Sequence, residues 1–247
     1  MELQRVLEFS FSLFKKDWRV VLPNVLNWVP FALLSLLILN GFNSITSLII
    51  LKISPVEIFK NLLFYASLAI PLLLASLLIS FFLSCVYCEI VRQAYSKRKI
   101  SLVKSFKVGK KRFIPLFGTY VLAFVILLFF NLLLIPLIFL GIWGILLFLI
   151  LIVLLNSIAF ILYFEIPAVV VLENSSGITA IKKSVEIGRK NFWSLVFVIF
   201  LTFFIVGIVN SSLSQIPFVG LIVSLIGSLF LNAWIYMLPA TFYLEFK

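Results

Sequence analysis

The stretch SFKVGKKRF at residues 105–113 recurs twice in this 247-residue chain, as SFSLFKKDW at 10–18 and as SVEIGRKNF at 184–192. Each copy opens with a serine, carries a basic pair at its sixth and seventh positions and ends in an aromatic residue. Each also leads directly into a long apolar segment. Recurrence of one pattern with a similar sequel predicts three copies of one structural unit.

The composition predicts that lipid surrounds most of the chain. Hydrophobic residues make up 64% of it, charged residues 12%, and the mean hydropathy is +1.25. A soluble domain carries about 25% charged residues. A water-soluble protein of this length has no core large enough for so much apolar surface, so the sequence indicates an integral membrane protein.

Long intervals without charge divide the chain into expected spans. A helix that crosses the bilayer needs about 20 apolar residues, and apolar runs such as LLLASLLIS lack the alternation of a transmembrane strand. We expect tight turns at 141–144 and around 211–217. Six transmembrane helices are therefore predicted, at about 20–40, 61–88, 113–135, 143–167, 192–211 and 217–242.

The expected fold is an all-α, polytopic membrane bundle in a single domain, 1–247. It consists of three hairpin repeats, at roughly 1–95, 96–174 and 175–247, each preceded by a cytoplasmic amphipathic helix that lies in the membrane interface. We call these three helices the elbows. Ser101 and Ser176 are expected to be N-caps of the second and third elbows. YCEI at 87–90 and YFEI at 163–166 close two corresponding spans and support the repeat.

The basic residues predict the orientation of the chain. With both termini inside, every Lys and Arg except Lys52 and Lys60 lies on the cytoplasmic side, as the positive-inside rule requires. The expected location is the cytoplasmic membrane. The net charge of +11 is then expected to attract anionic lipids, which are the expected partners, and not nucleic acid.

The repeated basic pairs and aromatics are the candidate lipid-headgroup residues. Two interpretations stay open: a device for membrane entry used three times, or a specific headgroup site built from the same cations. The residues concerned are Lys15, Lys16, Lys110, Lys111, Arg189 and Lys190, with Trp18, Phe113 and Phe192 as interfacial anchors.

Two carboxylates, Glu89 and Glu165, are expected at the inner ends of the second and fourth spans. Ionisable groups at spans are functional candidates by default. One interpretation is a structural ion pair that clamps elbow to hairpin, with Arg92 placed at i,i+3 from Glu89; the other is a proton- or cation-coupling site. A clamp at Glu165 predicts that Glu165→Gln lowers thermal stability.

Asparagines inside the spans are either hydrogen-bonding links between helices or, for Asn156 and Asn232, the lining of a polar cavity. The pair Cys85 and Cys88 is better read as two small buried hydrophobes than as a metal or redox site, since the chain has no histidine and no further cysteine. We expect no metal and no cofactor. Without histidine or a phosphate-binding glycine loop, an enzyme is not expected.

The third elbow, AIKKSVEIGRKNFWSLV at 180–196, follows Pro167, Val170 and Glu173 in a P-x-x-V-x-x-E pattern. With six expected spans, this resembles a broad group of prokaryotic six-helix membrane domains of unknown function. The group is related to the membrane domain attached to some glycerophosphodiester phosphodiesterases. The resemblance implies a helical bundle in a prokaryotic cytoplasmic membrane. Because this sequence shows no soluble phosphodiesterase domain, the resemblance implies no phosphodiesterase activity.

Three functional classes remain from the sequence, of which the least favoured is an intramembrane enzyme that acts on lipid. The first is a non-enzymatic accessory or organising module that binds lipids or another membrane protein. The alternative is a transporter, channel or lipid scramblase with a pathway along the bundle axis. A packed apolar axis favours the first, and polar groups that converge on the axis favour the second.

Overall fold

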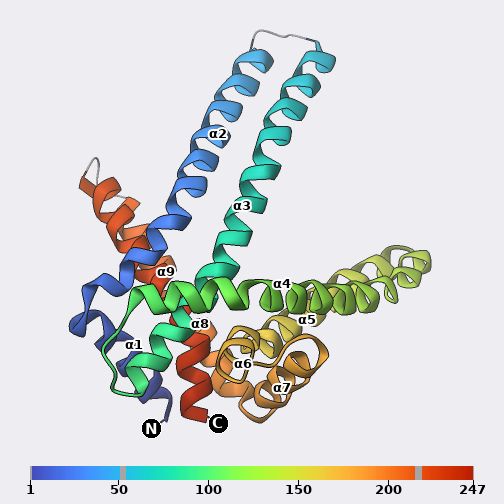
Figure 1. The fold of residues 1–247 in the computed structure, drawn as a ribbon. Coiled ribbons are helices and arrows are strands. Elements are labelled where there is room, and N and C mark those ends of the chain that lie inside the picture. Colours follow the sequence, from blue (N-terminus) through green and yellow to red (C-terminus); the bar gives the residue numbers. More distant parts are fainter. Residues whose placement is uncertain (1, 51–53, 215–218, 247) are drawn as a thin grey trace.

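The computed structural model describes residues 2–50, 54–214 and 219–246, and the regular structure in these ranges is helical throughout (Figure 1). The elements in chain order are α1 (Glu2–Lys16), the 3-10 helix η1 (Trp18–Asn24), α2 (Val25–Ile50), α3 (Pro55–Tyr95), α4 (Leu102–Leu132), the 3-10 helix η2 (Ile135–Leu140), α5 (Gly141–Tyr163), α6 (Ile166–Leu172), α7 (Gly177–Lys190), α8 (Phe192–Ser214) and α9 (Val219–Phe246).

The long apolar helices form three hairpins that spread apart from a common base (Figure 1). Helices α2 and α3 make the first hairpin, α4 and α5 the second, and α8 and α9 the third. The base consists of α1, α6 and α7 together with the ends of α3, α4, α5 and α9 that contact them. At 41 residues, α3 is about 60 Å long, roughly twice the hydrocarbon thickness of a bilayer, so its last turns extend into the base.

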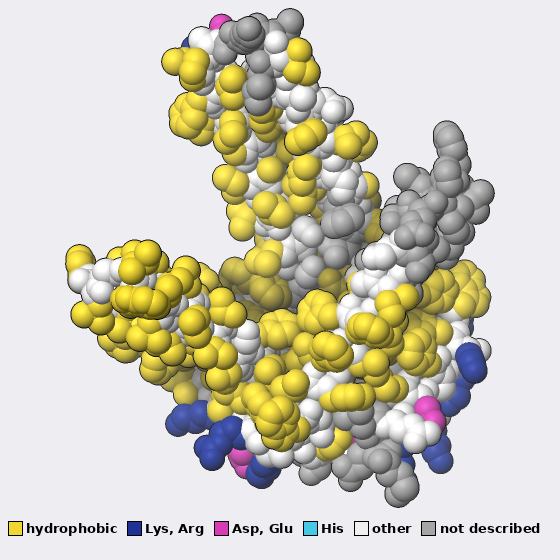
Figure 2. All heavy atoms as spheres, turned by 180° about the vertical axis from the view of Figure 1, so that it is seen from behind, with side chains coloured by type: hydrophobic (Ala, Val, Ile, Leu, Met, Phe, Trp, Pro, Cys, Tyr) yellow, Lys and Arg dark blue, Asp and Glu magenta, His cyan; other side chains and the backbone are white. Residues whose placement is uncertain are grey.

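The described core of the protein lies in the base. The end of α3, the whole of α6 and the last turns of α9 supply most of its buried residues, among them Tyr87, Val169 and Phe242. Away from the base, large apolar side chains of the hairpins are exposed. Figure 2 shows these apolar side chains over the hairpins, with most Lys and Arg side chains gathered at the base. Exposed apolar surface of this extent is typical of helices that face lipid, in agreement with the composition.

Three helical segments are long and apolar enough to cross a membrane: 18–47, 55–95 and 102–172, the last including both helices of the second hairpin. The pair α7 and α8, which is bent by 90°, would make a fourth. The described residues thus support three to four spanning segments. The six-span count stays a prediction, and the expected turn around 211–217 lies partly outside the described residues.

The expectation of three separate elbow helices was wrong for the second elbow. Helix α1 ends at Lys16 and α7 at Lys190, but α4 runs without interruption from the second elbow into its span. The residue between basic pair and aromatic accounts for the difference. In the first and third copies this position holds Asp17 and Asn191, which favour helix ends because their side chains compete for backbone groups. In the second copy it holds Arg112, a good helix former.

The second hairpin turns earlier than predicted. Helix α4 ends at Leu132, and the connection runs through η2, where Pro136 occupies the first turn, to Gly141. Gly141 has φ of 74°, a conformation that favours glycine, and α5 starts there. The predicted turn at 141–144 is therefore the first turn of α5 and not the connection.

The three repeated motifs occupy equivalent places in the base. Their serines, Ser10, Ser105 and Ser184, are all fully buried, and each is hydrogen-bonded to a helix of another hairpin. Ser10 Oγ lies 3.3 Å from Thr241 Oγ1 on α9, Ser105 Oγ accepts from Gln93 Nε2 on α3 at 3.2 Å, and Ser184 Oγ donates to the Leu162 carbonyl on α5 at 2.7 Å. Each elbow thus docks on the second helix of the preceding hairpin, with the first elbow on the third hairpin.

Glycines next to these serines allow the helices to approach closely. A Cβ on Gly109 would lie 2.6 Å from Val86 Cγ2 on α3, and one on Gly188 would lie 3.1 Å from the Leu162 Cα on α5. Contacts at 2.6 Å do not occur between packed carbon atoms, so residue 109 has to be glycine unless α3 and α4 move apart.

Gly109→Ala is expected to destabilise the protein by about 1–3 kcal/mol, because Val86 is β-branched and has little rotameric freedom in a helix. The matched control is Gly118→Ala on the same helix, where the added Cβ would meet nothing within 4 Å. The control should be neutral or slightly stabilising, since alanine favours helices. Thermal unfolding in one detergent compares the two; equal melting temperatures would contradict the close packing.

Candidate functional site

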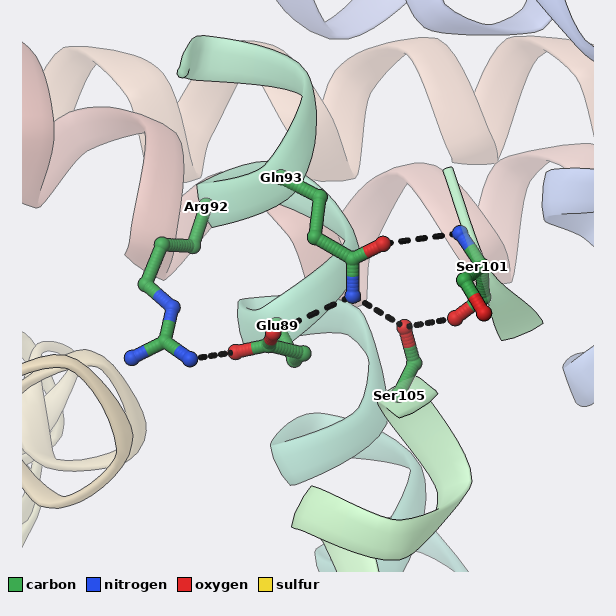
Figure 3. A network of polar contacts seen from close by, with 5 residues as sticks. All are labelled: Glu89, Arg92, Gln93, Ser101 and Ser105. Atoms are coloured by element: carbon green, nitrogen blue, oxygen red, sulfur yellow. Dashed lines mark hydrogen bonds and ion pairs between the residues drawn. The ribbon is translucent and has the colours of Figure 1, made fainter. Parts of the chain in front are cut away.

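The end of α3 carries a buried polar network (Figure 3). Glu89 is fully buried, and one of its carboxylate oxygens lies 2.5 Å from Arg92 Nη2 in an i,i+3 ion pair. Gln93 Nε2 donates to the other oxygen at 3.1 Å. Arg92 keeps 40% of its side chain exposed, so the pair joins the interior of the base to its surface.

Gln93 connects this carboxylate to the start of α4. Its Oε1 accepts from the Ser101 backbone N–H at 2.7 Å, and its Nε2 donates to Ser105 Oγ as well as to Glu89. Ser101 is the N-cap of α4, as predicted, because its Oγ accepts from the Lys104 N–H. Ser176 is likewise the N-cap residue of α7, as predicted, but its side chain makes no capping hydrogen bond. Gln93 itself carries no sequence motif and was missed.

Glu165 differs sharply from Glu89. It lies between α5 and α6, is fully buried, and neither of its carboxylate oxygens has a hydrogen-bond partner in the part of the chain that the structure describes. The ion pair to a basic elbow that the sequence suggested for Glu165 is therefore wrong. A buried carboxylate without a partner costs several kcal/mol when ionised, which makes this residue unusual among the buried groups.

Glu173 forms the clamp that was expected of Glu165. It caps the end of α6 and lies 2.5 Å from Lys183 Nζ on α7, the third elbow, while Tyr243 on α9 donates a hydrogen bond to its other oxygen. Three elements of the base thus meet at one carboxylate. The spacing of Glu173 and Lys183, ten residues apart across a loop, does not mark them as a pair in the sequence.

An apolar groove of about 540 Å³ opens between the second hairpin and α9. Its few polar groups include Ser84 of α3, Tyr120 of α4, Asn156 of α5 and Tyr236 of α9. Asn156 therefore lines a cavity, but Asn232 does not line this groove. The expectation of a polar cavity shared by these two asparagines is not met here.

Most of the described span asparagines link helices. Asn156 Nδ2 donates to Asn131 Oδ1 at 3.1 Å and so joins the two helices of the second hairpin. Asn24 donates to the Leu229 carbonyl on α9, and Asn27 is bonded to both Tyr236 and Ser76. Interhelical bonds of this kind contribute about 0.6 kcal/mol each in membranes.

The repeated cations are exposed, and their aromatic neighbours are exposed or half-buried. Trp18 is 66% exposed, whereas Phe113 and Phe192 are partly covered. The exposed cations are Lys15, Lys16, Lys110, Lys111, Arg189 and Lys190. Beside the first pair, the Arg19 side chain donates to the Asp17 carboxylate and lowers the pKa of that carboxyl below its usual value.

Cys85 and Cys88 are free thiols buried in the core of the base. Among the described residues, no group of three or more Cys, Asp or Glu side chains could hold a metal ion. The arrangement of the base therefore offers polar contacts and recesses, with no cluster of the described side chains arranged as a metal centre.

Neutralising Glu173 and neutralising Glu165 should have different effects on the stability of the protein. Glu173→Gln removes the ion pair to Lys183 and is expected to lower stability by about 1–2 kcal/mol. Glu165→Gln removes an unpartnered ionisable group and should leave the melting temperature in detergent unchanged or raise it. A clear loss of stability for Glu165→Gln alone would show that this carboxylate has a partner.

Comparison of the chain with protein-family models, curated proteins and solved structures finds no match.

Proposed function

We propose that this protein is a non-enzymatic module of the cytoplasmic membrane that binds membrane lipid beside its hairpins and so organises its surroundings. The base anchors the module at the inner leaflet through its cations, and the apolar groove receives an acyl chain. No catalytic step is part of this proposal.

The observation that carries the proposal is the filled axis of the base. From Leu83 to Val91, α3 passes through the base with almost every side chain buried, and α4, α6 and α9 pack around it. Tyr87, Cys88 and Ile90 have no exposed surface. A pathway for ions needs polar groups along such an axis. Apart from Glu89, which is paired with Arg92, the buried side chains from Leu83 to Val91 are hydrophobic, and this favours a module.

The groove supports lipid as the ligand. Its volume lies within the usual range of small-ligand pockets, and apolar side chains dominate its lining. It is flanked by Phe124 and Phe160, both of which are more than half exposed and so face the surrounding lipid. An acyl chain fits this chemistry, with Asn156 and Tyr236 as the nearest polar contacts for an ester group.

Leu127→Trp, which fills part of the groove from α4, is expected to reduce retained lipid. A loss of about 1.4 kcal/mol in affinity would lower occupancy on the order of tenfold at limiting lipid. The measurement is native mass spectrometry of the protein purified in a mild detergent.

The matched control is Leu128→Trp, the next residue of α4, which is 45% exposed and does not line the groove. It should retain lipid like the unmodified protein. Equal retention in both variants would contradict lipid binding in the groove. Recovery of a stoichiometric membrane protein in place of lipid would favour a protein partner as the ligand of the module.

A second candidate function, coupled transport, is favoured only by Glu165. A buried carboxylate without a partner is a group on which a proton or a monovalent cation can be carried. In liposomes, a flux of protons or monovalent cations that Glu165→Gln abolishes and Glu89→Gln retains would support coupled transport and count against the module. Absence of flux with intact lipid retention would support the module.

A further inference from the structure

A second recess, of about 360 Å³, lies where the end of α3 meets the start of α4. Its lining is polar and includes three cations and one carboxylate. The residues that line it are Glu89, Arg92, Gln93, Ser96, Arg98 and Lys104. None of its three cations belongs to the repeated basic pairs.

The charges of this recess are unbalanced. Glu89 is already paired with Arg92. Within the described part of the chain, the side chains of Arg98 and Lys104 have neither a hydrogen bond nor an ion pair. The lining therefore carries a net charge of +2, concentrated on two cations that have donors to spare.

The recess is held in shape by backbone and buried polar contacts. The Arg98 N–H donates to the Gln93 carbonyl at 3.0 Å, and Lys97, with φ of 54°, turns the chain back onto the end of α3. Gln93 fixes Ser101 and Ser105 at the start of α4 (Figure 3). Lys104 lies in the first turn of this 31-residue helix, whose positive dipole end adds to the field of the cations.

We propose that this recess binds a phosphate group, with Arg98 and Lys104 as its main ligands and Arg92 as a third cation. A phosphate offers several acceptor oxygens to the planar guanidinium fork of Arg98 and to the ammonium group of Lys104. The Glu89 carboxylate holds Arg92 in place, and its own charge is compensated by Arg92 and Gln93.

The phosphate can come from a lipid headgroup or from a soluble anion. The recess lies in the base, where the cations of the protein gather next to the apolar hairpins (Figure 2). A phospholipid headgroup occupies that same boundary. The headgroup version deepens the proposed function and rests on it, because it names the charge of the lipid that the module binds.

The experiment uses the full chain in nanodiscs of equimolar phosphatidylcholine and phosphatidylglycerol. Lipid that remains bound is then identified by native mass spectrometry. The double variant Arg98→Gln/Lys104→Gln should lose phosphatidylglycerol on the order of tenfold, since each charge-assisted hydrogen bond to the phosphate contributes several-fold. Retention of phosphatidylcholine should be unchanged, which separates this site from the apolar groove.

The matched control is Lys97→Gln/Lys99→Gln, which removes the same amount of charge from the loop between α3 and α4 without altering the lining of the recess. It should keep the preference for phosphatidylglycerol within about twofold. An equal loss in both double variants would mean diffuse surface charge and would overturn the proposed site. Loss of phosphatidylcholine in every variant would instead contradict lipid binding in the apolar groove, and with it the proposed function.

Inorganic phosphate distinguishes the two sources. In detergent without added lipid, phosphate should raise the melting temperature of the unmodified protein above that in chloride of equal ionic strength, and the Arg98→Gln/Lys104→Gln variant should show no such rise. Stabilisation by phosphate with no selective retention of phosphatidylglycerol assigns the site to a soluble anion. If phosphate does not stabilise the protein and phosphatidylglycerol is not selectively retained, the proposal is overturned.

Discussion

The structure depends on the close approach of each elbow to the second helix of another hairpin. Glycine at 109 and 188 removes the side chain that would hold the helices apart, and a buried serine in each motif makes the polar contact. The three contacts join the hairpins into one base, and outside it the hairpins are free to spread.

The repeat shows both what the sequence could predict and what it could not. The motif positions, the all-α class and the first and third elbows followed from periodicity and charge. The continuity of α4 did not, although one residue decides it: Arg112 continues the helix where Asp17 and Asn191 end it. The glycines at 141 and 144 predict a turn there, but Gly141, with its positive φ, begins a helix, and the turn of the second hairpin precedes it.

The polar sites were predicted less well, because ion pairs in the base join residues that the sequence does not place together. Glu89 and Arg92 are three residues apart on one helix and could be recognised as neighbours. Glu173 and Lys183 meet only because the chain turns between α6 and α7. Glu165 has the same apparent setting as Glu89, at the end of a span, yet α6 folds back beside it and buries it away from every described cation. Tertiary packing decides which carboxylate is paired.

The two recesses share helices α3 and α4, and their order along these helices matches that of a phospholipid. On α3, Ser84 lines the apolar groove and Glu89 lines the cationic recess, which is therefore nearer the end of the helix in the base. On α4, Lys104 lies in the first turn and Tyr120 more than four turns further toward the hairpin. Charge toward the base and apolar surface toward the hairpins is the same order as the headgroup and the acyl chains of a phospholipid. The packing of side chains around the end of α3 therefore does not prevent the protein from presenting such a surface at its side.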